Sequence, residues 1–151
     1  VFAKFAGCLF FYVILWAPSL LYFTAFGAVT GLDAAGAAGS YVGAYAMLLL
    51  MGCLFTAIGC LASALTDNQI VAAVVCFSAI LCLFFIGLLA FFIPSTGNAL
   101  REVTYYFSPI EHMMDFSRGI FDTRPVVFYL SSTLVVLFAT FHIFQYRRWK
   151  A

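Results

Sequence analysis

Charged residues are scarce in this chain of 151 residues. Lys and Arg number seven and Asp and Glu six, together 9% of the sequence, whereas 66% of the residues are hydrophobic. A soluble domain carries roughly 25% charged residues, because it needs a polar surface in water. The net charge of +1 also leaves no basic surface for nucleic acid. The composition therefore excludes an ordinary soluble domain and predicts a protein whose solvent is the lipid bilayer.

Motifs for nucleotide or metal chemistry are also missing. The chain has no G-x-x-x-x-G-K-[ST] phosphate loop and no CxxC pair. Its five cysteines lie within apolar stretches, where cysteine usually behaves as a small hydrophobic residue; they are Cys8, Cys53, Cys60, Cys76 and Cys82. We therefore expect no disulfide, no metal centre and no cofactor bound by this chain.

Four apolar stretches are long enough to cross a membrane, which takes about 20 residues of helix. They cover residues 5–29, 41–65, 70–93 and 126–146, and none contains Asp, Glu, Lys or Arg. Because lipid offers no hydrogen bonds, a spanning segment must be a helix or part of a closed barrel, and the period-two alternation of a barrel strand is absent. The sequence predicts an all-α polytopic transmembrane helical bundle in which residues 1–151 form one transmembrane domain.

Basic residues at both ends of the chain predict its orientation. Lys4 precedes the first span, and Arg147, Arg148 and Lys150 follow the last. Four crossings place both ends on one side, which the positive-inside rule assigns to the cytoplasm. We therefore expect an integral protein of the cytoplasmic (inner) membrane, with residues 30–40 as a short external link and 94–125 as a longer external segment.

A short polar turn separates the second and third spans. It consists of Thr66, Asp67, Asn68 and Gln69. Thr66 and Gln69 have the spacing of a capping box, which predicts that this turn starts the third helix. The turn either only caps that helix or also contacts a cytoplasmic partner.

The external segment is predicted to form two short amphipathic helices that lie at the membrane surface or dip into it. The first covers about residues 100–107. The second begins with Ser108 as N-cap, Pro109 at the first helical position and Glu111 two residues later. Gly119 is expected to end it.

Glu111, His112 and Asp115 on this second helix suggest a metal site, and Asp115 with Arg118 suggests an ion pair. Glu111 and Asp115 share a helix face, but a metal site needs three or four converging ligands, and no third one lies on that face. Arg118, three residues after Asp115, is better explained as its ion-pair partner.

Four small residues of the second span fall on one helical face. Gly52, Thr56, Gly59 and Ser63 are spaced by four, three and four residues. Small residues let helices approach closely in lipid. The face is predicted either to pack against another helix or to line a pathway, and the sequence leaves both open.

Two motifs resemble those of a known family. Residues 59–69 have the form G-x-x-x-S-x-L-T-x-N-Q, residues 116–124 the form F-x-R-G-x-x-D-x-R, and R-R-W stands near the end. This ordered set, over about the last two thirds of the chain, resembles the permease subunits of ABC-2 type exporters, especially gliding-motility-associated permeases. Pro125 departs from the pattern, which more often has an acidic residue there.

The resemblance implies a six-span subunit of which this chain contains the last four spans, so we expect the sequence to be a fragment. It implies that two permease chains, identical or similar, sit on two ABC ATP-binding subunits, which hold the ATP. This chain would then be a transport subunit without its own ATPase site.

Other functions fit the residues less well. An intramembrane hydrolase needs acids or a G-x-S-x-G motif, and the spans have neither. An ion-coupled carrier usually has ionisable residues near the midplane, and none is found there. A non-transporting membrane scaffold or assembly protein is the alternative that the sequence leaves open.

Overall fold

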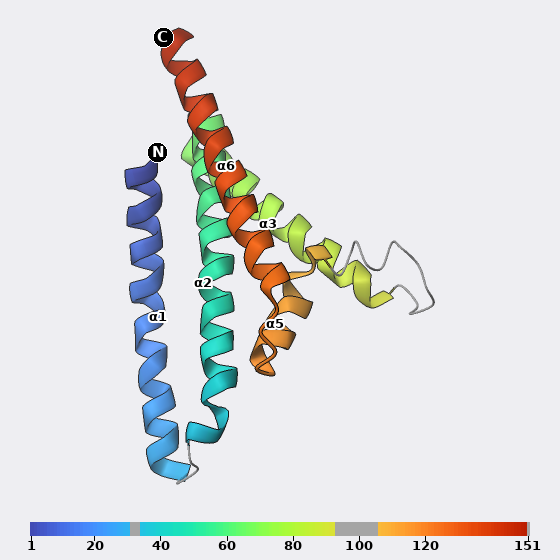
Figure 1. Ribbon diagram of the computed structural model, residues 1–151. Helices are drawn as coiled ribbons and strands as arrows, with labels where there is room; N and C mark the ends of the chain where they lie inside the picture. The colour runs from blue at the N-terminus through green and yellow to red at the C-terminus, as the bar shows by residue number, and fades with distance from the viewer. Residues whose placement is uncertain (31–33, 93–105, 151) are drawn as a thin grey trace.

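The computed structural model describes residues 1–30, 34–92 and 106–150. Within them lie the helices α1 (Phe2–Thr30), α2 (Ala34–Leu65), α3 (Gln69–Phe92), α5 (Pro109–Ser117) and α6 (Thr123–Lys150) (Figure 1). These described residues contain no strand, so the predicted all-α bundle is confirmed. Four helical segments are long and apolar enough to cross a membrane: Phe2–Val29, Gly39–Leu65, Gln69–Leu88 and Thr123–Tyr146.

The four long helices all begin earlier than the predicted spans, and two of these shifts have a clear local cause. α2 begins at Ala34, so most of the expected link over residues 30–40 is helical. That segment is rich in alanine, the residue with the highest helix propensity, and this outweighs its glycines. α6 begins at Thr123 and includes Pro125 in its first turn. The missing N–H of Pro125 costs no helical hydrogen bond, because the residue four positions earlier lies outside the helix.

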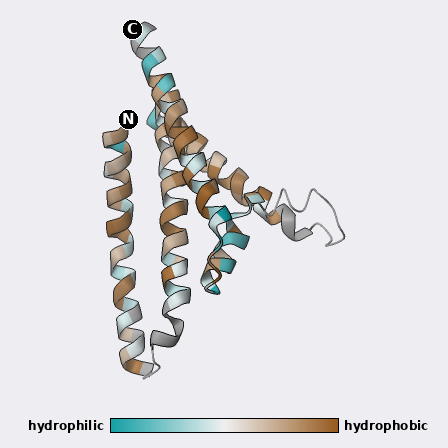
Figure 2. Cartoon of the chain, in the orientation of Figure 1, coloured by the Kyte–Doolittle hydropathy of each residue, from teal (hydrophilic) through white to brown (hydrophobic). Residues whose placement is uncertain are grey.

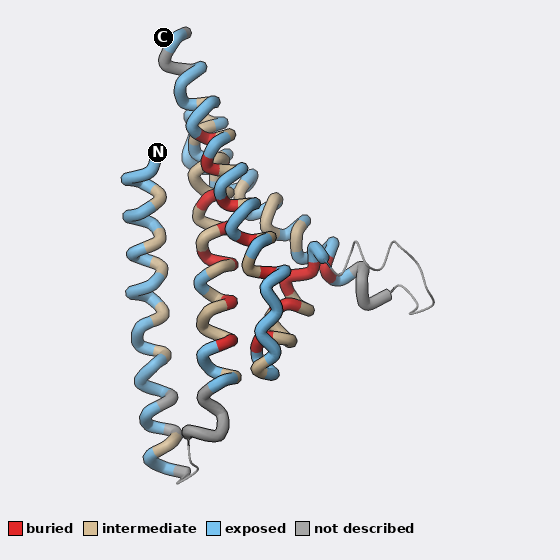
Figure 3. The backbone as a smooth tube through the Cα atoms, viewed as in Figure 1, coloured by how far each residue is buried: buried red, intermediate tan, exposed pale blue. Residues whose placement is uncertain are grey.

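α2 is the central helix of the bundle. It packs against α1, α3, α5 and α6, and its most extensive contact is with α6. Figure 3 shows the buried residues concentrated on α2, α5 and α6. In α1, by contrast, no described side chain is buried. α1 is therefore attached to one side of the other helices and is not enclosed by them.

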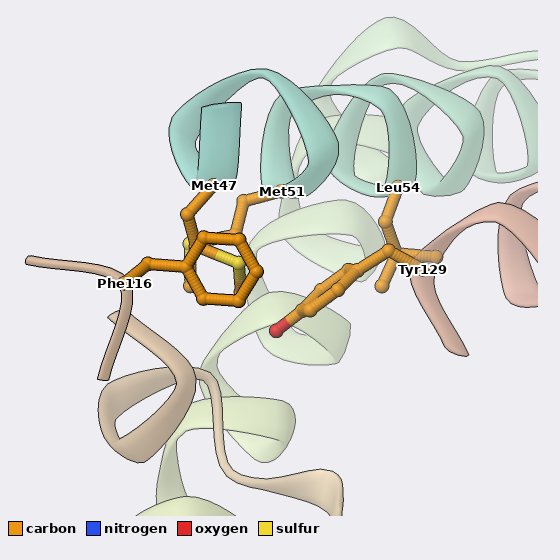
Figure 4. Close-up of a cluster of buried hydrophobic side chains, with 5 residues drawn as sticks. All are labelled: Met47, Met51, Leu54, Phe116 and Tyr129. Atoms are coloured by element: carbon orange, nitrogen blue, oxygen red, sulfur yellow. The ribbon is translucent and has the colours of Figure 1, made fainter. Parts of the chain in front are cut away.

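The core lies where three helices meet. Met47, Met51 and Leu54 of α2 pack with Phe116 of α5 and Tyr129 of α6 (Figure 4). All five are at most 7% exposed. In lipid such a core is stabilised by close packing rather than by removal of apolar surface from water. The short helix α5 is thus part of the bundle core.

The outer surface of the bundle is strongly apolar. Figure 2 shows hydrophobic residues along the long helices and polar ones gathered on α5. Large side chains such as Phe10, Leu21, Val135 and Phe138 are exposed by more than half. Soluble monomers rarely expose a continuous apolar surface of this extent. Together with the four long helices, this surface identifies a membrane protein.

Local hydrogen bonds set the bounds of α5. The Ser108 hydroxyl accepts a bond from the backbone N–H of Glu111 at 3.3 Å, and Pro109 is at the first helical position. The predicted start of this helix is confirmed. Of the other predicted external helix, only Tyr106 and Phe107 are among the described residues, and both are helical.

α5 ends in a Schellman motif. The N–H of Gly119 donates to Phe116 O at 3.0 Å, and that of Ile120 donates to Asp115 O at 3.1 Å. Gly119 has φ +79°, a left-handed conformation that glycine adopts without steric cost. Gly119 ends the helix, as predicted. The chain then reverses into α6, where the Asp122 carboxylate accepts a bond from Arg124 N–H at 3.1 Å.

Candidate functional site

Gly52, the first residue of the small-residue face of α2, lies directly under an aromatic side chain of α1. A Cβ placed on Gly52 would come within 2.8 Å of Cδ1 of Tyr12. The Tyr12 hydroxyl reaches across to α2 and donates to Leu48 O at 3.1 Å. The ring of Trp16 lies edge-on to the ring of Tyr12, and the two ring centroids are 6.2 Å apart. Gly52 is therefore a contact point between α1 and α2.

The other three residues of that face, Thr56, Gly59 and Ser63, line a pocket. The pocket has a volume of about 410 Å³ and lies between α1, α2 and α6. We call it the α1–α2–α6 pocket. Its lining residues are Val1, Lys4, Cys8, Thr56, Gly59, Cys60, Ser63, Ala64, Thr140 and Phe144. On this face Gly52 packs against α1, whereas Thr56, Gly59 and Ser63 border a cavity.

The pocket wall is more apolar than its residue types suggest. The Thr56 hydroxyl donates to Gly52 O at 2.7 Å, and the Thr140 hydroxyl donates to Val136 O at 2.7 Å. Both hydroxyls are therefore occupied by the backbone of their own helix. No acidic residue is among the lining residues, and Lys4 is their one charged side chain.

The turn between α2 and α3 differs in its capping from the prediction. The Thr66 hydroxyl donates back to Ala62 O at 3.2 Å. Asn68 caps α3 instead: its side-chain oxygen accepts from Ile70 N–H at 3.0 Å, and its carbonyl accepts from Ala72 N–H at 3.0 Å. The prediction of a capping box from Thr66 to Gln69 is therefore wrong, because Thr66 is used by the preceding helix.

This turn is accessible from outside the bundle. Asp67, Asn68 and Gln69 are exposed, and Thr66 is half-buried. Figure 1 shows the junction of α2 and α3 at the same end of the bundle as both ends of the chain. A partner on that side of the membrane could contact all three exposed side chains.

His112 of α5, which lies between Glu111 and Asp115 in the sequence, is buried in the bundle core. His112 is 4% exposed, and its ring meets that of Tyr129 edge-on at a centroid distance of 5.9 Å. Burial lowers the pKa of His112 below its ordinary value, and the carboxylates of Asp115 and Asp122 oppose this to a smaller extent. The imidazole is therefore held neutral among aromatic rings.

The other polar residues of α5 lie nearer its surface. Glu111 and Asp115 are half-buried, and Arg118 is exposed. Arg118 enters the end of the helix through its backbone N–H, which donates to Met114 O and Asp115 O. Its predicted ion pair with Asp115 stays a prediction. No group of three metal-ligating side chains converges anywhere in the described part of the chain.

Periodicity within one helix could not have identified several residues of the pocket. Cys8, Thr140 and Phe144 come from α1 and α6, and only the packing of these helices brings them opposite α2. For Lys4, which also lines the pocket, the sequence predicts only an effect on the orientation of the chain in the membrane. A pocket between helices depends on which helices are neighbours, and that information is not local.

The fold defines an all-α polytopic membrane protein. Comparison with known proteins identifies no relative of this chain. No family model matches it, and neither a curated protein nor a solved structure is significantly similar to it. The resemblance to exporter permeases therefore rests on the sequence motifs alone.

Proposed function

We propose that this chain is the membrane-spanning permease subunit of an ATP-driven ABC-2 type exporter, forming its translocation pathway and coupled to separate ATP-binding subunits. The observation that carries the proposal is the structural role of the motif over residues 116–124. Phe116 is in the core, Gly119 makes the left-handed turn, and Asp122 caps α6. Three of the five fixed letters of the motif, Phe116, Gly119 and Asp122, thus have a structural role in this α5–α6 turn, which favours a shared local fold over a chance match.

The placement of α2 supports a role in coupling. α2 contacts every other described helix and ends in the exposed turn at Asp67–Gln69. A partner that pushes on this turn would move α2 against α1, α5 and α6 together. Conversion of ATP-driven subunit closure into helix movement needs such a connected element.

The α1–α2–α6 pocket supports the pathway part of the proposal. It lies beside the turn, and Thr56, Gly59 and Ser63 of α2 border it. Because α1 is only loosely packed and contacts mainly α2, a change in the angle between them alters the width of the pocket. The pocket is therefore well placed to open and close during a transport cycle.

Co-purification tests the proposal. The protein that contains this chain is expressed in its native membrane and extracted in several mild detergents, and the bound subunits are identified by mass spectrometry. We expect a stoichiometric subunit with a phosphate-binding loop. If no ATPase is retained in any detergent, the exporter proposal is wrong and a membrane scaffold explains the chain better.

A pair of variants locates the contact. Asp67→Arg reverses a charge on the exposed turn, and Ser117→Arg adds one at the exposed end of α5 on the other side of the bundle. We expect Asp67→Arg to reduce ATPase retention about tenfold, since one mismatched charge at an interface costs on the order of 1–2 kcal/mol. Ser117→Arg should leave retention unchanged; equal losses in both variants would place the contact elsewhere.

A further inference from the structure

The α1–α2–α6 pocket has the shape and charge of a lipid site. We propose that it holds one acyl chain of an anionic phospholipid, drawn from the leaflet on the side of Lys4, with the headgroup phosphate at the Lys4 ammonium. The proposal concerns the membrane around the protein and does not depend on the exporter function.

The depth of the pocket suits an acyl chain that enters from the membrane boundary. Ala64 lies one residue before the end of α2, and Thr56 lies eight residues further into the span. At 1.5 Å per residue, the pocket extends about 12 Å along α2. On α1 and α6 the order is the same, with Lys4 and Phe144 near the ends of their spans and Cys8 and Thr140 deeper.

The wall favours hydrocarbon over water. The Thr56 and Thr140 hydroxyls are bonded to their own helices, and the other deep residues are Cys8, Gly59 and Cys60. A water molecule in a cavity needs two to four polar partners, which the deep part of this wall does not supply. At about 410 Å³ the pocket is within the size range of sites for small ligands.

The rim favours an anionic headgroup. Lys4 is exposed, and no Asp or Glu lies among the pocket residues to neutralise it. A lysine at this level of a membrane attracts anionic lipid. A zwitterionic lipid offers the same chain but brings its own cation to the Lys4 ammonium. Charge complementarity thus selects the anionic lipid among those that could fill the pocket.

Native mass spectrometry tests the proposal on the full chain. The protein is reconstituted in nanodiscs of equal parts phosphatidylglycerol and phosphatidylcholine, released in the gas phase, and the retained lipids are counted. Wild type should retain one phosphatidylglycerol preferentially. Lys4→Gln should lower this retention about fivefold, as expected for the loss of one lysine near the membrane surface, and Ser63→Phe should displace the lipid by filling the mouth of the pocket.

Matched variants serve as controls. Arg124→Gln removes an exposed cation at the start of α6, and Ser78→Phe adds the same ring to an exposed site on α3 outside the pocket. Both should retain phosphatidylglycerol as wild type does. Equal retention in Lys4→Gln, Ser63→Phe and wild type would overturn the proposal.

A second measurement uses the wild-type chain and so does not depend on a variant that folds. Cys60 lines the pocket, whereas Cys82 lies outside it on α3 and would face lipid in the membrane. Modification by N-ethylmaleimide, followed site by site, should slow at Cys60 as phosphatidylglycerol replaces phosphatidylcholine and should stay constant at Cys82. A Cys60 rate that is independent of headgroup would overturn the selection of anionic lipid.

Discussion

The glycines of α2 show at the residue scale how the bundle is assembled. A Cβ on Gly43 would run into Phe116 O of α5, one on Gly52 into the Tyr12 ring of α1, and one on Gly59 would only touch Cys76 Sγ of α3 at 3.7 Å. Gly43 and Gly52 thus contact two different helices and leave no space for a methyl group, whereas Gly59 does. Close approach of this kind is how helices associate in lipid.

Gly52→Ala tests this reading of the α1–α2 contact. The methyl group must displace the Tyr12 ring and its hydrogen bond to Leu48, so we expect a loss of about 1–3 kcal/mol in stability. Gly59→Ala is the matched control, because its methyl group would make only an ordinary van der Waals contact. Its stability should stay the same or rise by up to about 1 kcal/mol, since alanine has the higher helix propensity. Thermal unfolding in detergent measures both, and equal effects would show that Tyr12 does not pack on Gly52.

The Tyr129 hydroxyl provides a second test at the same scale. It is fully buried in the core, and no residue in the described part of the chain bonds to it. Because a buried hydroxyl without a partner is unfavourable, we expect Tyr129→Phe to keep or raise the stability, by up to about 1 kcal/mol. Tyr22→Phe, at an exposed position, should have no effect. A loss of more than about 1 kcal/mol in Tyr129→Phe would mean that this hydroxyl makes a bond that stabilises the core.

At the scale of elements, α5 is held by a buried histidine, and this predicts a pH dependence. Burial lowers the pKa of His112 in the docked helix, whereas released α5 would regain the ordinary value of 6.5. The released state therefore binds more protons between these two pKa values. The stability of docking should be complete above about pH 6.5 and fall as the pH decreases below it.

Hydrogen–deuterium exchange of residues 109–117, corrected for intrinsic rates, measures this effect at about pH 5 and about pH 8. We expect weaker protection of wild type at the lower pH. His112→Phe keeps an aromatic ring between Phe128 and Tyr129 but removes the titration, so its protection should not change with pH. His142→Phe changes an exposed histidine and should behave as wild type does; pH-independent protection in wild type would contradict the prediction.

The helices also show which features of the fold can be predicted from the sequence. The bounds of α5 were predictable because Ser108, Pro109 and Gly119 act on backbone groups within a few residues. The cap of α3 was not, because Thr66 and Asn68 both have suitable side chains and only the end of α2 decides between them. The pocket was predictable only in part, since Thr56, Gly59 and Ser63 share a face whereas their neighbours come from other helices.

At the scale of the whole molecule, α2 is held by its packing against α3, α5 and α6 and, separately, by its contact with α1. On one side α5 and α6 enclose it with buried side chains, and on the other α1 is attached through Tyr12, Gly52 and a hydrogen bond of 2.7 Å between the Ser19 and Tyr45 hydroxyls. The first contact is a packed core, and the second leaves a pocket at one end. Movement of α1 relative to α2 would therefore disturb the fewest buried contacts.

The orientation of the bundle yields the last prediction. Four predicted crossings would place both ends of the chain and the Asp67 turn on one side and Ser117 on the other, and the positive-inside rule predicts that the first side is the cytoplasm. In a background with the five native cysteines replaced by alanine, Ser117→Cys should react with a membrane-impermeant maleimide in intact cells. Asp67→Cys should react only after the membrane is permeabilised, since both positions are exposed and differ only in side. The reverse pattern would show that the positive-inside rule misassigns this chain, and reaction of both cysteines in intact cells would contradict the four-span topology itself.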